Sequence, residues 1–149
     1  MGQNDLADIL QFAISKEIQA VQMYSLMAKK AEFPHVRQLF EELAAEERNH
    51  RKMLQELDVS EIEGQDLTQF PEIRLTDYTV AQEFRPDMGL QDALLLAIQR
   101  EEKSYALYQK LQSGVVGKVR ALFTFLAGEE VKHRERLQKL YEEGILSEF

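Results

Sequence analysis

The chain consists of two copies of one segment, and this repeat restricts its fold more than any other feature. The stretch VRQLFEELAAEERNHRKMLQEL begins at Val36 and recurs as VRALFTFLAGEEVKHRERLQKL from Val119, 83 residues later. A shorter match precedes each copy, because AISKE at 13–17 corresponds to AIQRE at 97–101. An internal repeat indicates one supersecondary unit that is used twice. We therefore expect two related helical hairpins.

Four segments show the period of an amphipathic helix, with apolar residues at alternating steps of four and three. In each segment these residues form one line along the helix, which we call its seam. The seam is apolar except near its middle, where polar residues interrupt it. The four seams are Leu6, Leu10, Ala13, Glu17, Ala20, Tyr24, Met27; Val36, Phe40, Leu43, Glu47, His50, Leu54, Leu57; Leu90, Leu94, Ala97, Glu101, Ser104, Tyr108, Leu111; and Val119, Phe123, Leu126, Glu130, His133, Leu137, Leu140.

The connections between these segments predict the topology. Pro34 suits the first turn of the second helix, and Gly114 is a plausible stop for the third. Both links are short, so each pair of helices should be antiparallel. The 58–89 segment is long for a connection, yet it is rich in apolar residues and should be an ordered crossover along the bundle.

Together these features predict an all-α fold, a ferritin-like antiparallel four-helix bundle of two hairpins joined by one long crossover. A chain of 149 residues is long enough for one domain with a substantial core. We expect a single domain over 1–149, with hairpin 1 at about 4–57, the crossover at about 58–89 and hairpin 2 at about 90–143.

The polar seam residues specify a metal site. Residues three apart on a helix point the same way, so Glu47 with His50 should present an oxygen and a nitrogen ligand to one point. Glu130 with His133 repeats this arrangement, and the other two helices add one carboxylate each. The predicted ligands are Glu17, Glu47, His50, Glu101, Glu130 and His133. Four carboxylates and two imidazoles are the ligand set of di-iron and di-manganese bundles.

Charge balance favours two divalent cations in this cluster. Four ionised carboxylates in a dry seam would repel each other and lose hydration, whereas two divalent cations neutralise them. Oxygen-rich ligation favours Fe, with Mn as an alternative, over a structural Zn site; Zn or Co could substitute. The alternative is an amphipathic helix with solvated charges, but two motifs in register favour metal binding.

Outside the seams, we expect Glu46, Glu102 and Glu129 to be solvated and His35 to lie at the surface.

Tyr24 and Tyr108 lie seven residues after Glu17 and Glu101, on the same helix faces. One interpretation is buried aromatic packing with a partner for the hydroxyl group. The other is a hydrogen-bond donor that orients a ligand carboxylate and tunes the metal. The two interpretations are compatible.

Composition excludes several other classes of protein. The chain has no cysteine, which rules out disulfides, cysteine-zinc sites and thiol catalysis. Its formal net charge of −8 argues against nucleic acid as a partner. No apolar run reaches membrane-spanning length, and the first residues lack the features of a secretory signal. These observations predict a cytoplasmic protein that does not bind membranes.

The chain resembles the rubrerythrin branch of the ferritin-like di-iron superfamily. The family pattern is Glu-x6-Tyr, Glu-x2-His, Glu-x2-Glu-x3-Tyr and Glu-x2-His. The chain matches it in order across nearly its whole length, except at the second Glu of the third segment. The matching pairs are Glu17 and Tyr24, Glu47 and His50, Glu101 and Tyr108, and Glu130 and His133.

Two departures from the family pattern affect the expected chemistry. Ser104 stands where rubrerythrins have an extra Glu that takes part in peroxide reduction, and the remaining six ligands are closer to those of bacterioferritin-like ferroxidase sites. Ser104 can hold a water but cannot replace a carboxylate ligand. The cysteine-rich rubredoxin module is also missing, which implies that a separate electron donor is needed.

The resemblance implies a non-haem di-iron oxidoreductase that reduces peroxide or dioxygen, with O2 or H2O2 as substrate. Glu47 and Glu130 would bridge two Fe ions, and the other four residues would complete the two sites. Two alternatives remain: ferroxidation for iron storage or delivery, and a metal-stabilised bundle without turnover. The long crossover would permit a homodimer with exchanged hairpins. The sequence does not identify the native metal, the substrate, the donor or the number of subunits.

Overall fold

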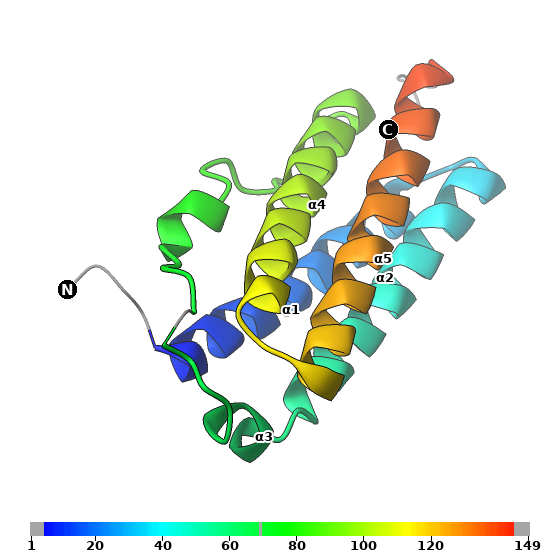
Figure 1. Ribbon diagram of the computed structural model, residues 1–149. Coiled ribbons are helices and arrows are strands. Elements are labelled where there is room, and N and C mark those ends of the chain that lie inside the picture. Colours follow the sequence, from blue (N-terminus) through cyan, green and yellow to red (C-terminus); the bar gives the residue numbers. More distant parts are fainter. Residues whose placement is uncertain (1–4, 69, 145–149) are drawn as a thin grey trace.

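The computed structural model describes residues 5–68 and 70–144, which form a four-helix bundle (Figure 1). No strand occurs in these residues. The predicted ferritin-like four-helix bundle of two hairpins with a long crossover is confirmed. The four long helices are α1 (Leu6–Lys30), α2 (Pro34–Gln55), α4 (Leu90–Ser113) and α5 (Gly117–Glu142), and the crossover contains α3 (Val59–Glu63) and the 3-10 turn η1 (Leu75–Tyr78).

Local sequence signals explain where the helices begin and end. The Asp5 side chain accepts a hydrogen bond from the Asp8 amide at 2.8 Å and so caps α1. Pro34 is the first residue of α2 and Gly114 follows the last residue of α4, as predicted. A side chain at Gly114 would meet the Phe70 ring, because a Cβ there would lie 2.3 Å from it. The predicted start of hairpin 1 at residue 4 lies outside the described residues.

Helix α2 is two residues shorter than its seam predicts. It ends at Gln55, whereas the seam continues to Leu57. The cause is a new helix start immediately after it, because the Asp58 side chain accepts from the Ser60 amide at 2.9 Å and caps α3. Leu57 still packs against the core.

The core consists of two apolar clusters, one toward each end of the bundle. Ile9 near the start of α1 shares a cluster with Leu54 near the end of α2. Met27 near the end of α1 shares the other cluster with Val36 near the start of α2. Helices α1 and α2 are therefore antiparallel, and the polar seam residues lie between the two clusters.

The crossover runs along the bundle (Figure 1), and its apolar residues pack against both clusters. Ile62 and Ile73 are fully buried in the cluster that contains Ile9. Val80, Phe84 and Met88 pack in or against the other cluster. The apolar residues that predicted an ordered crossover are thus the residues that attach it to the bundle. No helix in the described part of the chain is both long enough and apolar enough to cross a membrane.

Candidate metal centre

The six residues predicted as ligands converge at the middle of the bundle. They are the only charged or polar residues that are buried in the described part of the chain, with at most 3% of each exposed. Each long helix contributes at least one of them, because the seams place their polar positions at the same height. The six are Glu17, Glu47, His50, Glu101, Glu130 and His133.

The six side chains form two overlapping groups that share Glu47 and Glu130. One group adds Glu17 and His50, and the other adds Glu101 and His133. Within each group the potential ligand atoms all lie within 4.8 Å of one another. Such an arrangement could hold two cations side by side, with Glu47 and Glu130 within reach of both.

The two imidazole rings face each other across the cluster. Their centroids are 5.6 Å apart and their planes differ by 10°. Nδ1 of His50 lies 3.4 Å from Glu130 Oε1, and Nδ1 of His133 lies 3.3 Å from the same oxygen. Each ring therefore directs the same nitrogen at a carboxylate that the two groups share.

Unpartnered polar atoms are concentrated in this cluster. Among the described residues, six buried atoms of the cluster have no hydrogen-bond partner: Glu17 Oε2, Glu47 Oε1, both carboxylate oxygens of Glu130, and Nδ1 of both His50 and His133. Glu47 Oε1 lies 2.6 Å from His133 Nδ1, at ion-pair distance but without hydrogen-bond geometry.

An unsatisfied buried polar atom costs about 1–3 kcal/mol, and more if it is charged. Native proteins satisfy nearly all such groups. Six unsatisfied oxygen and nitrogen atoms around one centre are therefore explained best as metal ligands. Hard carboxylate oxygens with one imidazole per position fit Fe or Mn, so the residues present fit the predicted pair of ions.

The pKa values show how unfavourable the cluster is without cations. Burial raises the pKa of Glu17, Glu47 and Glu130 well above its usual range, and neighbouring carboxylates raise it further. Burial also lowers the pKa of His50. Burial alone would lower the pKa of His133 too, but the surrounding carboxylates outweigh it and raise the pKa overall. The metal-free cluster must therefore hold protons that divalent cations would displace.

The two tyrosines bond across the bundle and not within their own helices. The Tyr24 hydroxyl on α1 donates to Glu101 Oε2 on α4 at 2.6 Å, and the Tyr108 hydroxyl on α4 donates to Glu17 Oε1 on α1 at 2.6 Å. Burial and the nearby carboxylate charges raise the pKa of both phenols well above its usual range, which keeps them protonated as donors.

Both interpretations of the tyrosines agree with the structure. The Tyr24 ring stacks on Phe40 and the Tyr108 ring stacks on Phe123, with centroids 6.5 and 6.4 Å apart. Each tyrosine therefore fills the apolar cluster with its ring and holds a predicted ligand with its hydroxyl. Their influence on a bound metal stays a prediction.

Sequence reasoning missed Glu46, which was expected to be solvated. Its side chain is only 39% exposed, and Oε1 lies 3.1 Å from His133 Nε2. Arg136 donates to its other oxygen at 3.0 Å. Although burial alone would raise it, the pKa of Glu46 is lowered overall by the hydrogen bonds from Arg136 and His133. A carboxylate on the outer nitrogen of a metal-binding histidine fixes the ring orientation.

Of the other residues outside the seams, Glu102 and His35 agree with the expectation of solvation and Glu129 does not. Glu102 is exposed, as predicted, and so is His35. Glu129 is only partly solvated, because its side chain is 19% exposed and pairs with Lys132 at 3.3 Å. Ser104 is half-buried and lines a small cavity beside Glu101.

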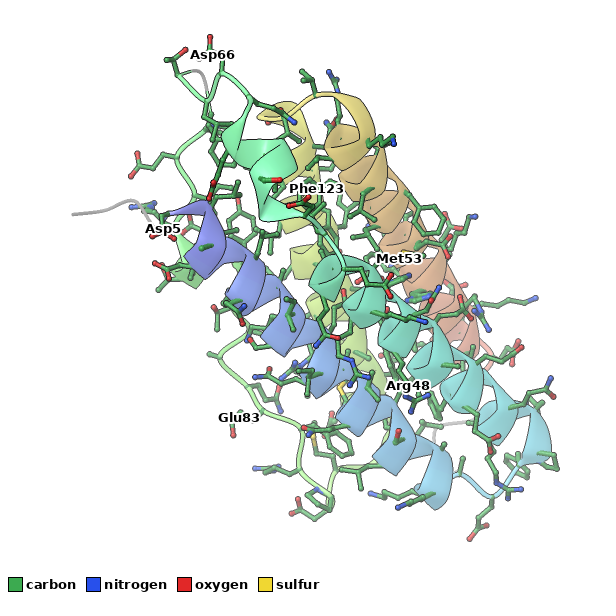
Figure 2. The ribbon with its side chains drawn as sticks, turned by 90° about the horizontal axis from the view of Figure 1, so that it is seen from below. Asp5, Arg48, Met53, Asp66, Glu83 and Phe123 are labelled. Carbon is green, nitrogen blue, oxygen red and sulfur yellow. The ribbon has the colours of Figure 1, made fainter. Side chains whose placement is uncertain are left out.

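The repeat contains a signal that distinguishes Glu46 from its counterpart Glu129. Arg136, which anchors Glu46, corresponds to Met53 in the first copy (labelled on α2 in Figure 2). Methionine carries no charge, so Glu129 has no equivalent anchor on the facing helix. The environments of His50 and His133 therefore differ, and a comparison of the two copies could have revealed this.

We expect Glu46→Ala to weaken metal binding at the His133 position by about tenfold or more, because His133 loses the group that orients it. Stepwise titration with Mn²⁺ against a competing chelator measures the affinity of both positions, and only one of the two affinities should fall. Glu129→Ala is the matched control and should change neither position appreciably. Equal losses in both variants would contradict a specific role for Glu46.

Comparison with known proteins agrees with this geometry. Residues 8–141 match the sequence model of the rubrerythrin family. No curated protein gives a significant match to the chain.

Solved structures share the fold over nearly the full chain. A hypothetical protein from Pyrococcus furiosus is 27% identical, with a TM-score of 0.67 and coverage of 93% of this chain and 92% of the other. A structure from Thermotoga maritima, described as a ferritin-like diiron-carboxylate protein, is 22% identical, with a TM-score of 0.72 and coverage of 96% and 98%. A dodecameric thioferritin, the bacterioferritin-related protein of Bacteroides fragilis, is 22% identical, with a TM-score of 0.70 and coverage of 95% and 89%.

Proposed function

The chain belongs to the rubrerythrin family, and we propose that it is a non-haem di-iron oxidoreductase that reduces peroxide or dioxygen. The observation that carries this proposal is the buried cluster of six side chains whose inward-facing atoms lack partners. A structural bundle would gain stability from apolar residues at these positions, since buried ionic groups are expensive to desolvate.

Each residue of the cluster has a role that follows from its place. Glu47 and Glu130 belong to both groups and would bridge the two ions. The other four residues would complete the separate positions: Glu17 and His50 in one, Glu101 and His133 in the other. A bound pair of iron ions would supply the two electrons that reduction of one peroxide to two waters consumes.

The surrounding groups hold this arrangement in place. The hydroxyl groups of Tyr24 and Tyr108 each fix one carboxylate and retain their protons. The apolar clusters close the centre off from water at both ends of the bundle. Electrons would come from outside these 149 residues, which contain no cysteine and hence no cysteine ligands for an iron–sulfur cluster.

Ferroxidation for iron storage or delivery is the second candidate. The observation that favours it is Ser104, which provides no carboxylate at the position of the family's extra Glu, so that six ligands remain. Storage requires a closed cage. Mass measurement in solution separates the two, because a homodimer cannot enclose a mineral whereas a large hollow assembly can.

A turnover experiment tests the proposed activity. The protein is loaded with Fe(II) without oxygen, mixed with H2O2 or O2, and supplied with a chemical reductant. We expect repeated consumption of oxidant with no uptake of further iron, and its loss in Glu47→Ala/Glu130→Ala. Continued uptake of Fe(II) as mineral would support the ferroxidase instead. Tight metal binding without oxidant consumption would instead indicate a metal-stabilised bundle without turnover.

A further inference from the structure

A small cavity reaches the candidate metal centre from one side of the bundle. It lies between α1 and α4 beneath the crossover, where Tyr78 and Val80 cover it. Its inner wall includes Tyr24, Glu47 and Glu101, so it borders the site directly. The cavity volume is about 20 Å³, which is room for about one water molecule.

Ser104 keeps this cavity open. Its side chain forms part of the wall next to Glu101, one turn further along α4. Serine ends at its hydroxyl group, whereas the glutamate of the family pattern has a methylene group in place of that hydroxyl and a carboxylate beyond it. The same substitution that removes a ligand therefore leaves space beside the centre.

Three cations line the same cavity: Lys16, Arg100 and Lys103. Within the described residues none of them forms a salt bridge with a carboxylate. Lys16 and Arg100 both donate to the side-chain oxygen of Gln19, at 3.4 and 3.3 Å. Lys103 donates to the Asp77 carbonyl at 3.0 Å. Their charges are thus held in place by neutral acceptors and are not cancelled by direct pairing.

One carboxylate acts on this group of cations. Glu83 interacts electrostatically with Lys16 and Arg100, and it lies on the crossover beside α1 (Figure 2). Nε of Arg100 is buried and has no hydrogen-bond partner among the described residues. The inner wall also holds Glu47 and Glu101, whose charges the two bound cations would balance. The outer part of the passage then has three cations against Glu83 and is positive, in a chain whose formal net charge is −8.

We propose that this passage admits small inorganic monoanions to the metal centre and resists Fe²⁺. A cleft lined by one sign of charge raises the local concentration of oppositely charged ligands and their association rate. The same field repels a divalent cation. The inference rests on the proposed function and deepens it, because it assigns the passage to small anionic ligands or inhibitors of the centre and denies it to iron as a substrate. The neutral substrates O2 and H2O2 would be neither attracted nor repelled by this charge.

Azide is the probe, because it is a slender monoanion whose binding to ferric iron changes the visible absorption. Its association rate constant is measured by rapid mixing with the iron-loaded, oxidised protein. The test variant is Lys16→Gln/Arg100→Gln/Lys103→Gln. The matched control, Lys29→Gln/Lys52→Gln/Lys118→Gln, removes three exposed charges elsewhere on the molecule. Iron content is determined for every variant before mixing.

We expect the test variant to bind azide about tenfold more slowly at low ionic strength. The difference should shrink as salt is added, because about 0.1 M salt screens charges beyond roughly 10 Å. The control variant should resemble the unmodified protein. Nitric oxide, a neutral probe of similar size, should bind the reduced forms of all three proteins at equal rates.

A second variant tests the route itself. Ser104→Leu fills the cavity, so azide should bind more slowly at every salt concentration while the iron content is unchanged. Azide binding at the unmodified rate in both variants would overturn the inference. That result is distinct from a failure of the proposed function, in which the unmodified protein would hold no pair of iron ions or would consume no oxidant.

Discussion

The metal-free protein should unfold at a temperature roughly 15–30 °C below that of the loaded protein. A ligand present at 1,000 times its dissociation constant stabilises the folded state by about 4 kcal/mol per site, so two sites provide about 8 kcal/mol. In a protein of this size each kcal/mol changes the midpoint by about 2–4 °C. The unpartnered oxygen atoms of Glu47 and Glu130 give the physical reason, because they gain a binding partner only when cations are present.

Differential scanning calorimetry measures this effect. Protein stripped with a chelator is compared with protein that has been reloaded with Mn²⁺, which avoids oxidation during heating. Glu47→Ala/Glu130→Ala is the control and should show no dependence on Mn²⁺. Equal midpoints for stripped and reloaded protein would mean that the cluster does not bind this cation tightly.

Stability should respond to pH in opposite directions with and without metal. In the metal-free protein, Glu17, Glu47 and Glu130 have pKa values raised by burial above the ordinary 4.5. The folded state therefore binds more protons than the unfolded state, and this contribution is complete below the ordinary value. It is lost as the pH rises through the raised values. The raised pKa of His133 acts in the same direction, whereas the lowered pKa of His50 opposes it.

Metal binding reverses this dependence because the ligands must be deprotonated. Cations compete with protons for the same oxygen and nitrogen atoms, so affinity and stability increase as the pH rises. Urea unfolding at several values between roughly pH 5 and pH 8 measures both trends. Without metal the midpoint should fall with rising pH, and with saturating Mn²⁺ it should rise. Parallel trends would contradict the assignment of the buried carboxylates.

The sequence predicts most of the fold because the bundle follows from periodicity. The seams predict which faces are buried, and Pro34 and Gly114 predict two helix boundaries that the structure confirms. The end of α2 was predicted too late, because a seam shows only which residues are buried. Leu57 remains in contact with the core after the helix has ended.

The convergence of the six cluster residues was predictable because each copy repeats them on an apolar seam. The partners of Tyr24 and Tyr108 were not, since each hydroxyl group bonds the carboxylate on the opposite helix. That choice depends on the packing of α1 against α4, which a single helix face does not encode. Glu46 was missed for a related reason, because the position of its side chain depends on a hydrogen bond from Arg136 on another helix.

Elemental analysis of the purified protein tests the central claim most directly. Protein from iron-replete cells is compared with Glu47→Ala/Glu130→Ala, which loses both bridging carboxylates. The proposed centre predicts about two metal ions per chain, mostly iron, and almost none in the variant. Metal at the same low level in both proteins would show that the buried cluster holds protons and not cations, and would contradict the di-iron assignment.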